Sequence, residues 1–363
     1  MPAMCGSRHS PAALGYRLPA EWEPHQATWI SWPHNRSTWP EAFEHAEPVM
    51  ARAVAALTAG ETVRINVLDE THAARARKYL EDAVADPAQV VFHSIPTNDA
   101  WCRDHGAIFV VRPPALGTPL AAVDCGFNAW GGKYPPFDLD EAVARRMAGT
   151  LGVPRFEAGM ILEGGSIDVN GAGTLLTTEQ CLLNPNRNPG MDRQRIETRL
   201  GELFGTNEIL WLGEGIVGDD TDGHVDDLTR FVARDAVVTV VESNAADGNF
   251  APLRENLRRL RSFRMADGGA LEVIEMPMPA PQFHRGERLP ASYANFYVAN
   301  AVVLAPAFAD PADDTAAGIL AECFPGRKVL PIDCRKLVVG LGAFHCLTQQ
   351  VPALPLARGR TMS

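Results

Sequence analysis

The chain has 363 residues, of which 46% are hydrophobic, and its formal net charge at pH 7 is -11. This length and apolar content suit a large buried core, while the acidic balance argues against nucleic acid or an anionic membrane surface as a partner. No apolar run approaches the roughly 20 residues of a membrane-spanning helix, and residues 1–15 lack the continuous apolar segment of a secretory signal.

Short apolar runs along the chain predict strands, and stretches with helical periodicity lie between them. We expect strands at 63–68, 90–95, 107–111, 161–169, 173–177, 237–241 and 301–306. We expect helices at 43–57, 71–84, 141–151, 194–203, 252–263 and 313–323. This alternation is typical of an α/β protein, for which a doubly wound sheet is the default. No Gly-x-Gly-x-x-Gly opens a helix after the first strand, so dinucleotide binding has no support.

The chain shows no sign of a domain boundary. Prolines and glycines are scattered through the expected turns, without a low-complexity tract or a block of like charge. We predict one domain over residues 14–355, with flexible termini at 1–13 and 356–363. Seven widely spaced cysteines without a Cys-x-x-Cys pair suit reduced thiols in a cytoplasm better than a disulfide framework or a zinc ribbon. A mixed His/Cys metal site assembled in three dimensions stays open.

Cys346 differs from the other cysteines because its flank is polar and rich in glycine. Residues 345–350 read His-Cys-Leu-Thr-Gln-Gln, whereas free cysteines are mostly small buried hydrophobic residues. Three polar segments lie upstream, at 98–104, 162–166 and 223–226. Together the four segments supply a thiol, a histidine and at least three carboxylates. That set suits a site that binds a flat cation such as a guanidinium and attacks its central carbon.

His224 and Asp226 are two positions apart, so on an extended strand both side chains would leave the same face. Histidine moves protons near neutral pH, and the carboxylate can bind a cation. For an isolated His-x-Asp the alternative is a surface loop or a metal pair. We expect His345 to point away from Cys346 if the local chain is extended, and we assign it no catalytic role.

These segments, in this order, resemble the agmatine deiminase and bacterial peptidylarginine deiminase family of the guanidine-modifying superfamily. The resemblance begins at residues 18–25, continues through 127–136 and 184–189, and ends at 349–352. It implies a five-bladed α/β propeller (pentein) of pseudo-symmetric ββαβ units around a central channel, although the sequence shows no clear repeat. It also implies a small cationic guanidine as substrate and a reaction without a cofactor. The cysteine pattern and the lack of a signal segment lead us to expect this deiminase in the cytoplasm.

The resemblance implies a role for each polar residue. Cys346 is the nucleophile, His224 is the general acid and then the base, and Glu163 orients His224 and holds it protonated. Asp104 and Asp226 bind the guanidinium, whose paired N–H groups suit bidentate carboxylates. The expected substrate-binding neighbours are the aromatic wall Trp101 together with Asp220, Asp99 and Asn98.

Two of these assignments have a plainer alternative. Asp104 could pair with its neighbour Arg103 on a solvated loop, and Asp220 could belong to a turn in the Asp-rich segment 218–223. One electrostatic expectation follows for the thiol. Several carboxylates around Cys346 should raise the pKa of its thiol, and a bound cation should reverse that bias.

Two segments depart from the family pattern. Residues 340–346 read Gly-Leu-Gly-Ala-Phe-His-Cys in place of Gly-Gly-Gly-Asn-Ile-His-Cys, and residues 103–107 read Arg-Asp-His-Gly-Ala in place of Arg-Asp-Thr-Gly-Pro. We expect hydrolysis of agmatine, a reaction of polyamine metabolism, with peptidylarginine or another alkylguanidine as the alternative substrate. An amidinotransferase and a non-catalytic guanidine-binding protein are the more distant alternatives. The sequence carries no signal for an oligomeric state.

Overall fold

The structure is a computed structural model of the whole chain, and it describes residues 9–265 and 268–354. The flexible termini expected at 1–13 and 356–363 therefore lie outside the described residues, apart from 9–13. There the chain enters a short 3-10 turn, η2 (Ala12–Leu14). None of the helices in the described ranges combines the length and hydropathy that a membrane crossing requires.

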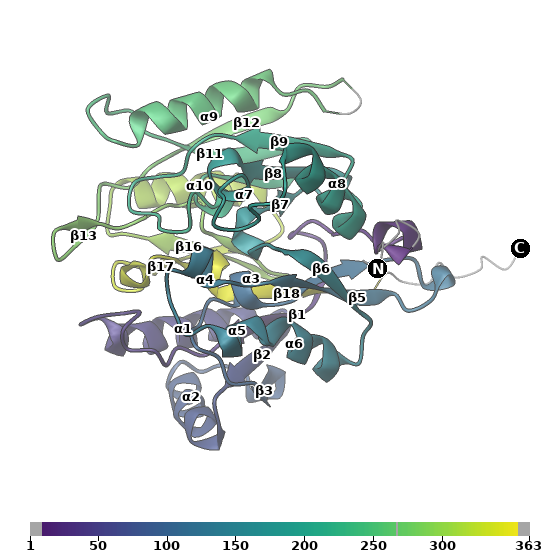
Figure 1. Cartoon of the computed structure of the whole chain (residues 1–363). Coiled ribbons are helices and arrows are strands. Elements are labelled where there is room, and N and C mark those ends of the chain that lie inside the picture. The colour runs from purple at the N-terminus through teal and green to yellow at the C-terminus, as the bar shows by residue number, and fades with distance from the viewer. Residues whose placement is uncertain (1–8, 266–267, 355–363) are drawn as a thin grey trace, which may run out of the picture.

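Five mixed sheets of the described residues share one strand pattern, in which an antiparallel pair is followed by a parallel neighbour (Figure 1). In sequence, at least one helix lies between the pair and the parallel strand, as a parallel connection requires. Each sheet with its helix is therefore a ββαβ unit. Four of the sheets consist of β4(Ile108–Val111), β5(Leu120–Gly126) and β6(Arg155–Ile161); β7(Asp168–Val169), β8(Thr174–Thr178) and β9(Glu208–Leu212); β10(Thr229–Ala233), β11(Ala236–Val241) and β12(Glu272–Pro277); β15(Tyr297–Val298), β16(Val302–Ala307) and β17(Lys328–Asp333).

The fifth sheet joins the two ends of the chain. Its strands, in spatial order, are β18(Thr348–Pro352), β1(His25–Ser31), β2(Thr62–Val67) and β3(Val90–Ser94). The last strand, β18, pairs antiparallel with β1, so that Thr28 lies opposite Gln350. Since β18 begins two residues after Cys346, this pairing fixes the thiol segment beside the N-terminal strand. A separate hairpin is formed by β13(Phe283–His284) and β14(Glu287–Arg288).

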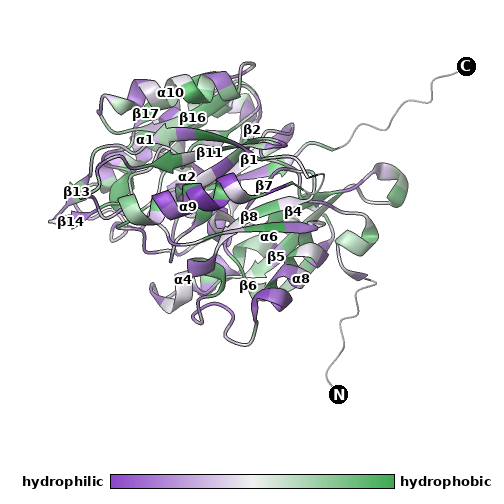
Figure 2. Cartoon of the chain, turned by 90° about the horizontal axis from the view of Figure 1, so that it is seen from above, coloured by the Kyte–Doolittle hydropathy of each residue, from purple (hydrophilic) through white to green (hydrophobic). Residues whose placement is uncertain are grey.

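The longer helices lie around the outside of the molecule, with the sheets between them (Figure 1). They are α1(Phe43–Leu57), α2(Glu70–Asp82), α6(Val143–Leu151), α8(Arg193–Phe204), α9(Phe250–Ser262) and α10(Ala312–Cys323). Figure 2 shows hydrophilic turns on α9. Its buried Leu260 belongs to the same apolar cluster as Val237 of β11. The helix thus turns an apolar stripe to its sheet and polar residues to solvent.

Local sequence explains where these helices begin and end, as α8 illustrates. Asp192 caps its first turn by accepting a hydrogen bond from the backbone N–H of Arg195 at 2.9 Å. Ile196 and Leu200 are buried one turn apart and define the inner face. The helix ends at Gly205, whose φ of 70° is the left-handed conformation that glycine adopts without steric cost.

Short helices and turns connect the strands and carry most of the polar motifs. They are α3(Cys102–His105), α4(Ala129–Gly132), α5(Asp138–Glu141), α7(Glu179–Leu182), α11(Phe344–Leu347), η3(Pro87–Gln89), η4(Pro114–Leu116), η5(Gly164–Ser166), η6(Val225–Asp227) and η7(Val338–Gly340). The single strand expected over residues 161–169 is wrong in its middle, because only its ends are strand, in β6 and β7. There β6 ends at Ile161, and the chain turns through η5 because its two glycines must pass close to Arg103 and His224.

The first prediction concerns the sheet that joins the chain ends. Ile65 of β2 is fully buried, so Ile65→Ala should lower the free energy of unfolding by about 2–5 kcal/mol through lost burial and a residual cavity. Chemical denaturation measures this change. Val91→Ala on β3, where the side chain is 37% exposed, is the control and should cost no more than about 0.5 kcal/mol. Equal losses in the two variants would contradict this packing.

Candidate active site

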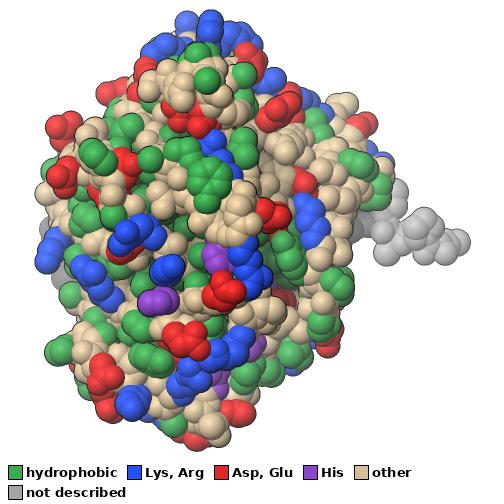
Figure 3. Space-filling view, turned by 90° about the vertical axis from the view of Figure 1, so that its left-hand side faces the viewer, with side chains coloured by type: hydrophobic (Ala, Val, Ile, Leu, Met, Phe, Trp, Pro, Cys, Tyr) green, Lys and Arg blue, Asp and Glu red, His purple; other side chains and the backbone are tan. Residues whose placement is uncertain are grey.

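One cavity of about 1260 Å³ has Cys346 in its lining. Its wall also contains Trp101, Asp104, Trp130 and Asp220, which come from distant parts of the sequence. Residues of the β13–β14 hairpin line it too. That hairpin projects on the left of Figure 1, and Figure 3 shows the same side, where acidic, basic and histidine side chains mix over a hollowed surface.

The thiol of Cys346 lies on the short helix α11 and is 5% exposed. Its Sγ accepts a hydrogen bond from Nδ2 of Asn295 at 3.0 Å and donates one to Oδ2 of Asp226 at 3.5 Å. Oδ1 of Asn295 accepts the backbone N–H groups of Ala343 at 3.1 Å and of Cys346 at 3.3 Å. A single asparagine therefore holds both the thiol and the backbone that carries it.

Asp104 lies on α3 and points into the cavity, where two groups fix its carboxylate. Oδ1 accepts the backbone N–H of Gly165, and Oδ2 accepts the indole N–H of Trp130, both at 3.0 Å. Its neighbour Arg103 turns the other way and donates to Glu21 at 3.1 Å. Both side chains are buried. The alternative of an Arg103–Asp104 ion pair on a solvated loop is therefore wrong.

His224 and Asp226 are fully buried next to Asp104 and Cys346, but they do not lie on a strand. His224 precedes η6, and Asp226 is inside that 3-10 turn, so the expected extended geometry is wrong. Both side chains still lie close to Asp104 and Gly165. Nδ1 of His224 is 3.8 Å from Oδ1 of Asp104, and Oδ2 of Asp226 would lie 2.9 Å from a Cβ at Gly165. Gly165 makes this possible, since a Cβ there would lie 2.6 Å from Nδ1 of His224.

Glu163 faces His224 from the other side. Its Oε2 is 3.9 Å from Nε2 of His224, and its Oε1 accepts Nε of the buried Arg187 at 2.6 Å. At this distance the two groups form an ion pair without a hydrogen bond, and the orienting role that the family resemblance implied for Glu163 stays a prediction. Burial opposes the charge of Glu163, but His224 and then Arg187 outweigh it and lower the pKa of this carboxyl.

Several buried polar atoms of this cluster have no hydrogen-bond partner within the described residues. They are Oε2 of Glu163, both ring nitrogens of His224, and Oδ1 of Asp226. Buried polar groups are nearly always paired in folded proteins, and pairing fails mainly where a ligand or a reaction needs the group. Their concentration around one thiol marks this end of the cavity as the place where a polar ligand would be held.

The electrostatics of the cluster follow from burial and from its carboxylates. Burial, then Asp226, Asp227 and Asp104, raise the pKa of the Cys346 thiol well above its usual value. The pKa of His224 is also raised well above its usual value, because Asp104 and Glu163 outweigh burial. Burial raises the pKa of Asp104 as well, although His224 opposes this. The raised pKa of the Cys346 thiol agrees with what the number of nearby carboxylates predicted.

The four expected substrate-binding residues line the same cavity as Cys346. Oδ1 of Asn98 accepts two backbone N–H groups at the start of α5, at 2.9 and 3.1 Å, so its amide oxygen has a structural role. Burial raises the pKa of Asp99 to about 6, and its carboxylate accepts the Thr38 hydroxyl. The ring of Trp101 packs beside a second tryptophan at 5.5 Å between centroids. Asp220 accepts the hydroxyl of Tyr134.

Sequence reasoning missed several residues that complete the site, and it misplaced one. His345 does not point away from the site, because α11 is helical rather than extended, and its Nδ1 lies 2.6 Å from Oδ2 of Asp226. The unassigned Glu21, Trp130 and Arg187 lie in segments 18–25, 127–136 and 184–189, which carried the family resemblance without an assigned role. Asn295 and Arg230 lay outside every quoted motif.

Glu163, Cys181 and His224 offer one atom each within 4.8 Å of one another, which is a spacing that a metal ion could use. The surrounding charge argues against one. The guanidinium of Arg187 already binds Glu163, so a divalent cation would lie beside a buried positive charge. Burial also raises the pKa of the Cys181 thiol, which disfavours the thiolate that a metal needs.

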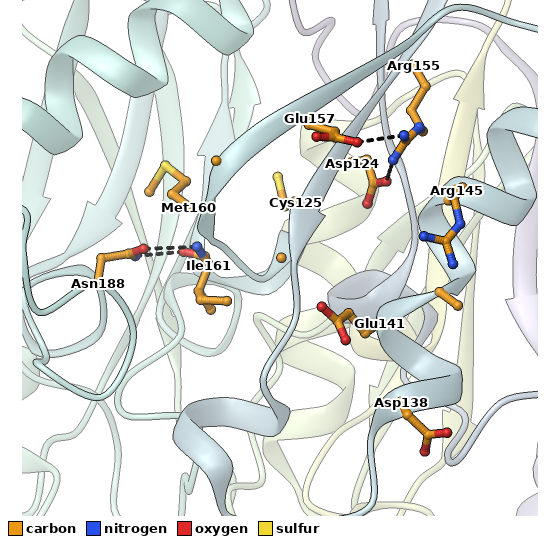
Figure 4. A pocket seen from close by; sticks show the side chains of 13 residues that line it. Asp124, Cys125, Asp138, Glu141, Arg145, Arg155, Glu157, Met160, Ile161 and Asn188 are labelled. Carbon is orange, nitrogen blue, oxygen red and sulfur yellow. Dashed lines mark hydrogen bonds and ion pairs between the residues drawn. The ribbon is translucent and has the colours of Figure 1, made fainter. Parts of the chain in front are cut away.

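A second hollow of about 570 Å³ shares no lining residue with the thiol cavity (Figure 4). Arg155 crosses it and pairs with Asp124 and Glu157. Cys125 lies in its wall, but burial raises the pKa of that thiol and no histidine joins it in the lining. The chemistry of a thiol with a histidine and converging carboxylates belongs to the first cavity.

Comparison with known proteins agrees with this geometry. The family described as Porphyromonas-type peptidyl-arginine deiminase matches residues 17–352. The chain is 37% identical to the agmatine deiminase of Medicago truncatula, over 95% of this chain and 99% of that protein. The solved agmatine deiminase of Enterococcus faecalis has a TM-score of 0.88 at 29% identity, covering 96% of this chain and 98% of the other. The C. jejuni agmatine deiminase has a TM-score of 0.82 at 30% identity, covering 94% and 97%. The resemblance found in the sequence is confirmed, and the chain belongs to the Porphyromonas-type peptidyl-arginine deiminase family.

Proposed function

We propose that the protein is an agmatine deiminase, which hydrolyses the guanidinium of agmatine to N-carbamoylputrescine and ammonia. One observation carries the proposal. A buried thiol lies among the carboxylates Asp104 and Asp226 and the orphaned polar atoms of Glu163 and His224. A planar cation with several N–H donors would satisfy those carboxylates and bring its central carbon to the sulfur. The agmatine deiminases among the relatives support the choice of substrate.

The reaction divides into two displacements at the guanidinium carbon. The sulfur of Cys346 adds to the carbon, His224 gives its proton to one terminal nitrogen, and ammonia leaves as that C–N bond breaks. The product of this step is an alkylthiouronium on Cys346. Water then adds to the same carbon with His224 as base, the C–S bond breaks, and the thiol is restored. The released product carries the oxygen of the water.

Substrate charge takes part in activating the nucleophile. Without a bound cation, burial and the nearby carboxylates keep Cys346 protonated. A guanidinium between Asp104 and Asp226 neutralises those charges and lowers the pKa of the thiol. The thiol then releases its proton to solvent, while Asp226 stays ionised and holds the guanidinium. A neutral isostere lacks this effect and should react poorly.

We further propose that the five ββαβ units are blades of a propeller and that the catalytic residues meet near its axis. The common strand pattern of the five sheets supports this, as does the pairing of β18 with β1, which would close the ring. Asp104, Glu163, Asp226 and Cys346 each lie on a short turn or helix next to a different sheet. Such turns at the inner ends of blades would converge without a long loop.

The distal part of the site distinguishes agmatine from an arginine residue in a protein. Asp220 and Asp99 are carboxylates on the cavity wall, and we assign Asp220 to the terminal ammonium of agmatine. An α-carboxylate on the substrate would meet like charge there. Peptidylarginine is the second candidate, because the matched family carries that description and the cavity, at about 1260 Å³, exceeds the size of agmatine.

The second prediction tests the nucleophile. Cys346→Ser should lose at least about 1000-fold in kcat while still binding agmatine, since the hydroxyl is a far weaker nucleophile than the thiol. Ammonia release measures the rate, and intact-protein mass spectrometry of His224→Ala looks for a trapped amidino adduct. Cys323→Ser, at a half-buried cysteine outside the cavity, is the control. Wild-type turnover in Cys346→Ser would remove cysteine chemistry from the mechanism.

The third prediction tests the raised thiol pKa. Thiolate forms only as pH rises through the raised pKa, so iodoacetamide should label Cys346 slowly at pH 7. Asp226→Asn removes a nearby negative charge and should lower the pKa of the Cys346 thiol. Each unit by which this pKa falls gives about tenfold more thiolate at pH 7. Peptide mass spectrometry follows the rate, and Asp124→Asn in the second hollow is the control. Slower labelling in Asp226→Asn than in the wild type would refute this electrostatic scheme.

The fourth prediction concerns substrate choice. Agmatine should exceed a blocked arginine amide in kcat/KM by at least about tenfold, which corresponds to about 1.4 kcal/mol of transition-state discrimination. Free arginine should be poorer still, because its α-carboxylate would face Asp220 and Asp99. Asp220→Asn should raise KM for agmatine and so reduce the ratio of kcat/KM between agmatine and the blocked arginine amide. An equal or reversed preference in the wild type would favour peptidylarginine and leave the thiol mechanism in place.

A further inference from the structure

His345 connects two buried carboxylates. Its Nδ1 lies 2.6 Å from Oδ2 of Asp226, and its Nε2 lies 2.9 Å from Oε2 of Glu21. All three side chains are buried. An ionised carboxylate can only accept hydrogen bonds, so an imidazole that bonds to two of them must carry a proton on both nitrogens. By this hydrogen-bond count, His345 is a buried imidazolium.

Glu21 is held in place from several directions. Arg230 donates to its Oε1 at 2.9 Å, Arg103 donates to its Oε2 at 3.1 Å, and the backbone N–H of Val298 donates to its Oε1 at 2.8 Å. These three donors belong to segments that are far apart in sequence. The carboxylate beneath His345 is therefore rigid and ionised, and the pKa of Glu21 lies well below its usual value although burial opposes this.

We propose that His345, held by Glu21, is a positioning residue that keeps Asp226 in the orientation needed to bind the guanidinium. The two oxygens of Asp226 differ in a way that supports this. Oδ2 accepts His345 and the thiol of Cys346, whereas Oδ1 is buried without a partner in the described part of the chain. The histidine thus fixes one oxygen and leaves the other for the substrate. This inference rests on the proposed function.

The location of His345 fits positioning rather than direct chemistry. The ring nitrogens of His345 contact Asp226 and Glu21, and His345 and Glu21 line a hollow of about 30 Å³ that shares no lining residue with the thiol cavity. An imidazole behind Asp226 reaches the substrate only through that carboxylate. The position also explains why His345 shares a helical turn with Cys346, because α11 directs the two side chains to different surroundings of the same aspartate.

The charges around Asp226 come from several elements. Its charged and titratable neighbours are His345 and Cys346 on α11, Arg230 on β10, Asp104 on α3, and His224 and Asp227 in its own loop. His345 in turn faces Glu21 and Asp168. Burial alone would raise the pKa of Asp226, and the hydrogen bond from His345 is the largest effect that lowers it. Loss of His345 therefore raises this pKa, and the carboxylate becomes neutral at a higher pH.

The test compares pH profiles of kcat/KM for agmatine in the wild type, His345→Gln and Glu21→Gln. Glutamine cannot carry the positive charge, so the acid limb of His345→Gln should move up by at least about one pH unit. At pH values below the acid limb, each pH unit of this shift corresponds to about tenfold lower kcat/KM, and raising the pH restores part of the activity. Glu21→Gln should move the limb in the same direction by less. In the double variant the shift should equal that of His345→Gln, because Glu21 acts through His345.

Glu47→Gln is the matched control, since this fully buried carboxylate accepts hydrogen bonds from Trp32 and Arg75 and none of the three lines the cavity. It should lower thermal stability without moving the acid limb. Profiles of His345→Gln and Glu21→Gln that superpose on the wild type, or additive shifts in the double variant, would overturn the positioning role. If His345→Gln does not fold, Glu21→Gln alone decides. A wild type that releases no ammonia from agmatine would refute the proposed function instead.

Discussion

The central constraint in this protein is that two carboxylates are buried beside a buried thiol. Asp104 and Asp226 both lie within the protein, and both raise the pKa of Cys346. Burial of a charge without a partner is costly, so the fold must supply balancing groups or leave the balance to a ligand. Here the fold supplies part of the balance through His224 and His345, and the unpartnered Oδ1 of Asp226 is left for a cation.

The rest of the architecture serves to hold those charges still. Arg187 fixes Glu163, and Arg230 and Arg103 fix Glu21, so that each residue behind the site is itself held by a buried guanidinium. Groups locked in this way cannot relax when no substrate is present. Electrostatic pre-organisation of this kind is usually the largest contribution to rate enhancement, and it is achieved at the expense of stability.

The sequence predicted the parts of the fold that follow from local pattern. The helix expected at 43–57 is α1 without change, and the others lie within about two residues of their ends, because amphipathic periodicity and caps are local signals. Strands such as β5, β6 and β18 were not predicted, because polar or small residues interrupt their apolar pattern and pairing with a neighbouring strand decides whether they form. The strand geometry assigned to His224 and Asp226 was wrong, because the two residues lie at a 3-10 turn. A spacing of two residues does not distinguish such a turn from a strand, in which alternate side chains share a face. The contact of His345 with Glu21 could not be predicted, since it joins residues more than 300 positions apart.

The most direct test of the central claim is whether a guanidinium group is needed to neutralise the buried carboxylates Asp104 and Asp226. The melting temperature of Cys346→Ser, which cannot form the covalent adduct, can be measured in the presence of agmatine and in the presence of putrescine. Putrescine has the same four-carbon chain and terminal ammonium as agmatine, with a second ammonium in place of the guanidinium. A ligand that binds only the native state raises the melting temperature with its concentration. If Asp104 and Asp226 bind the guanidinium, agmatine should raise the melting temperature with its concentration, and putrescine should raise it little or not at all. Equal rises for both ligands, or no rise for agmatine, would contradict the central claim.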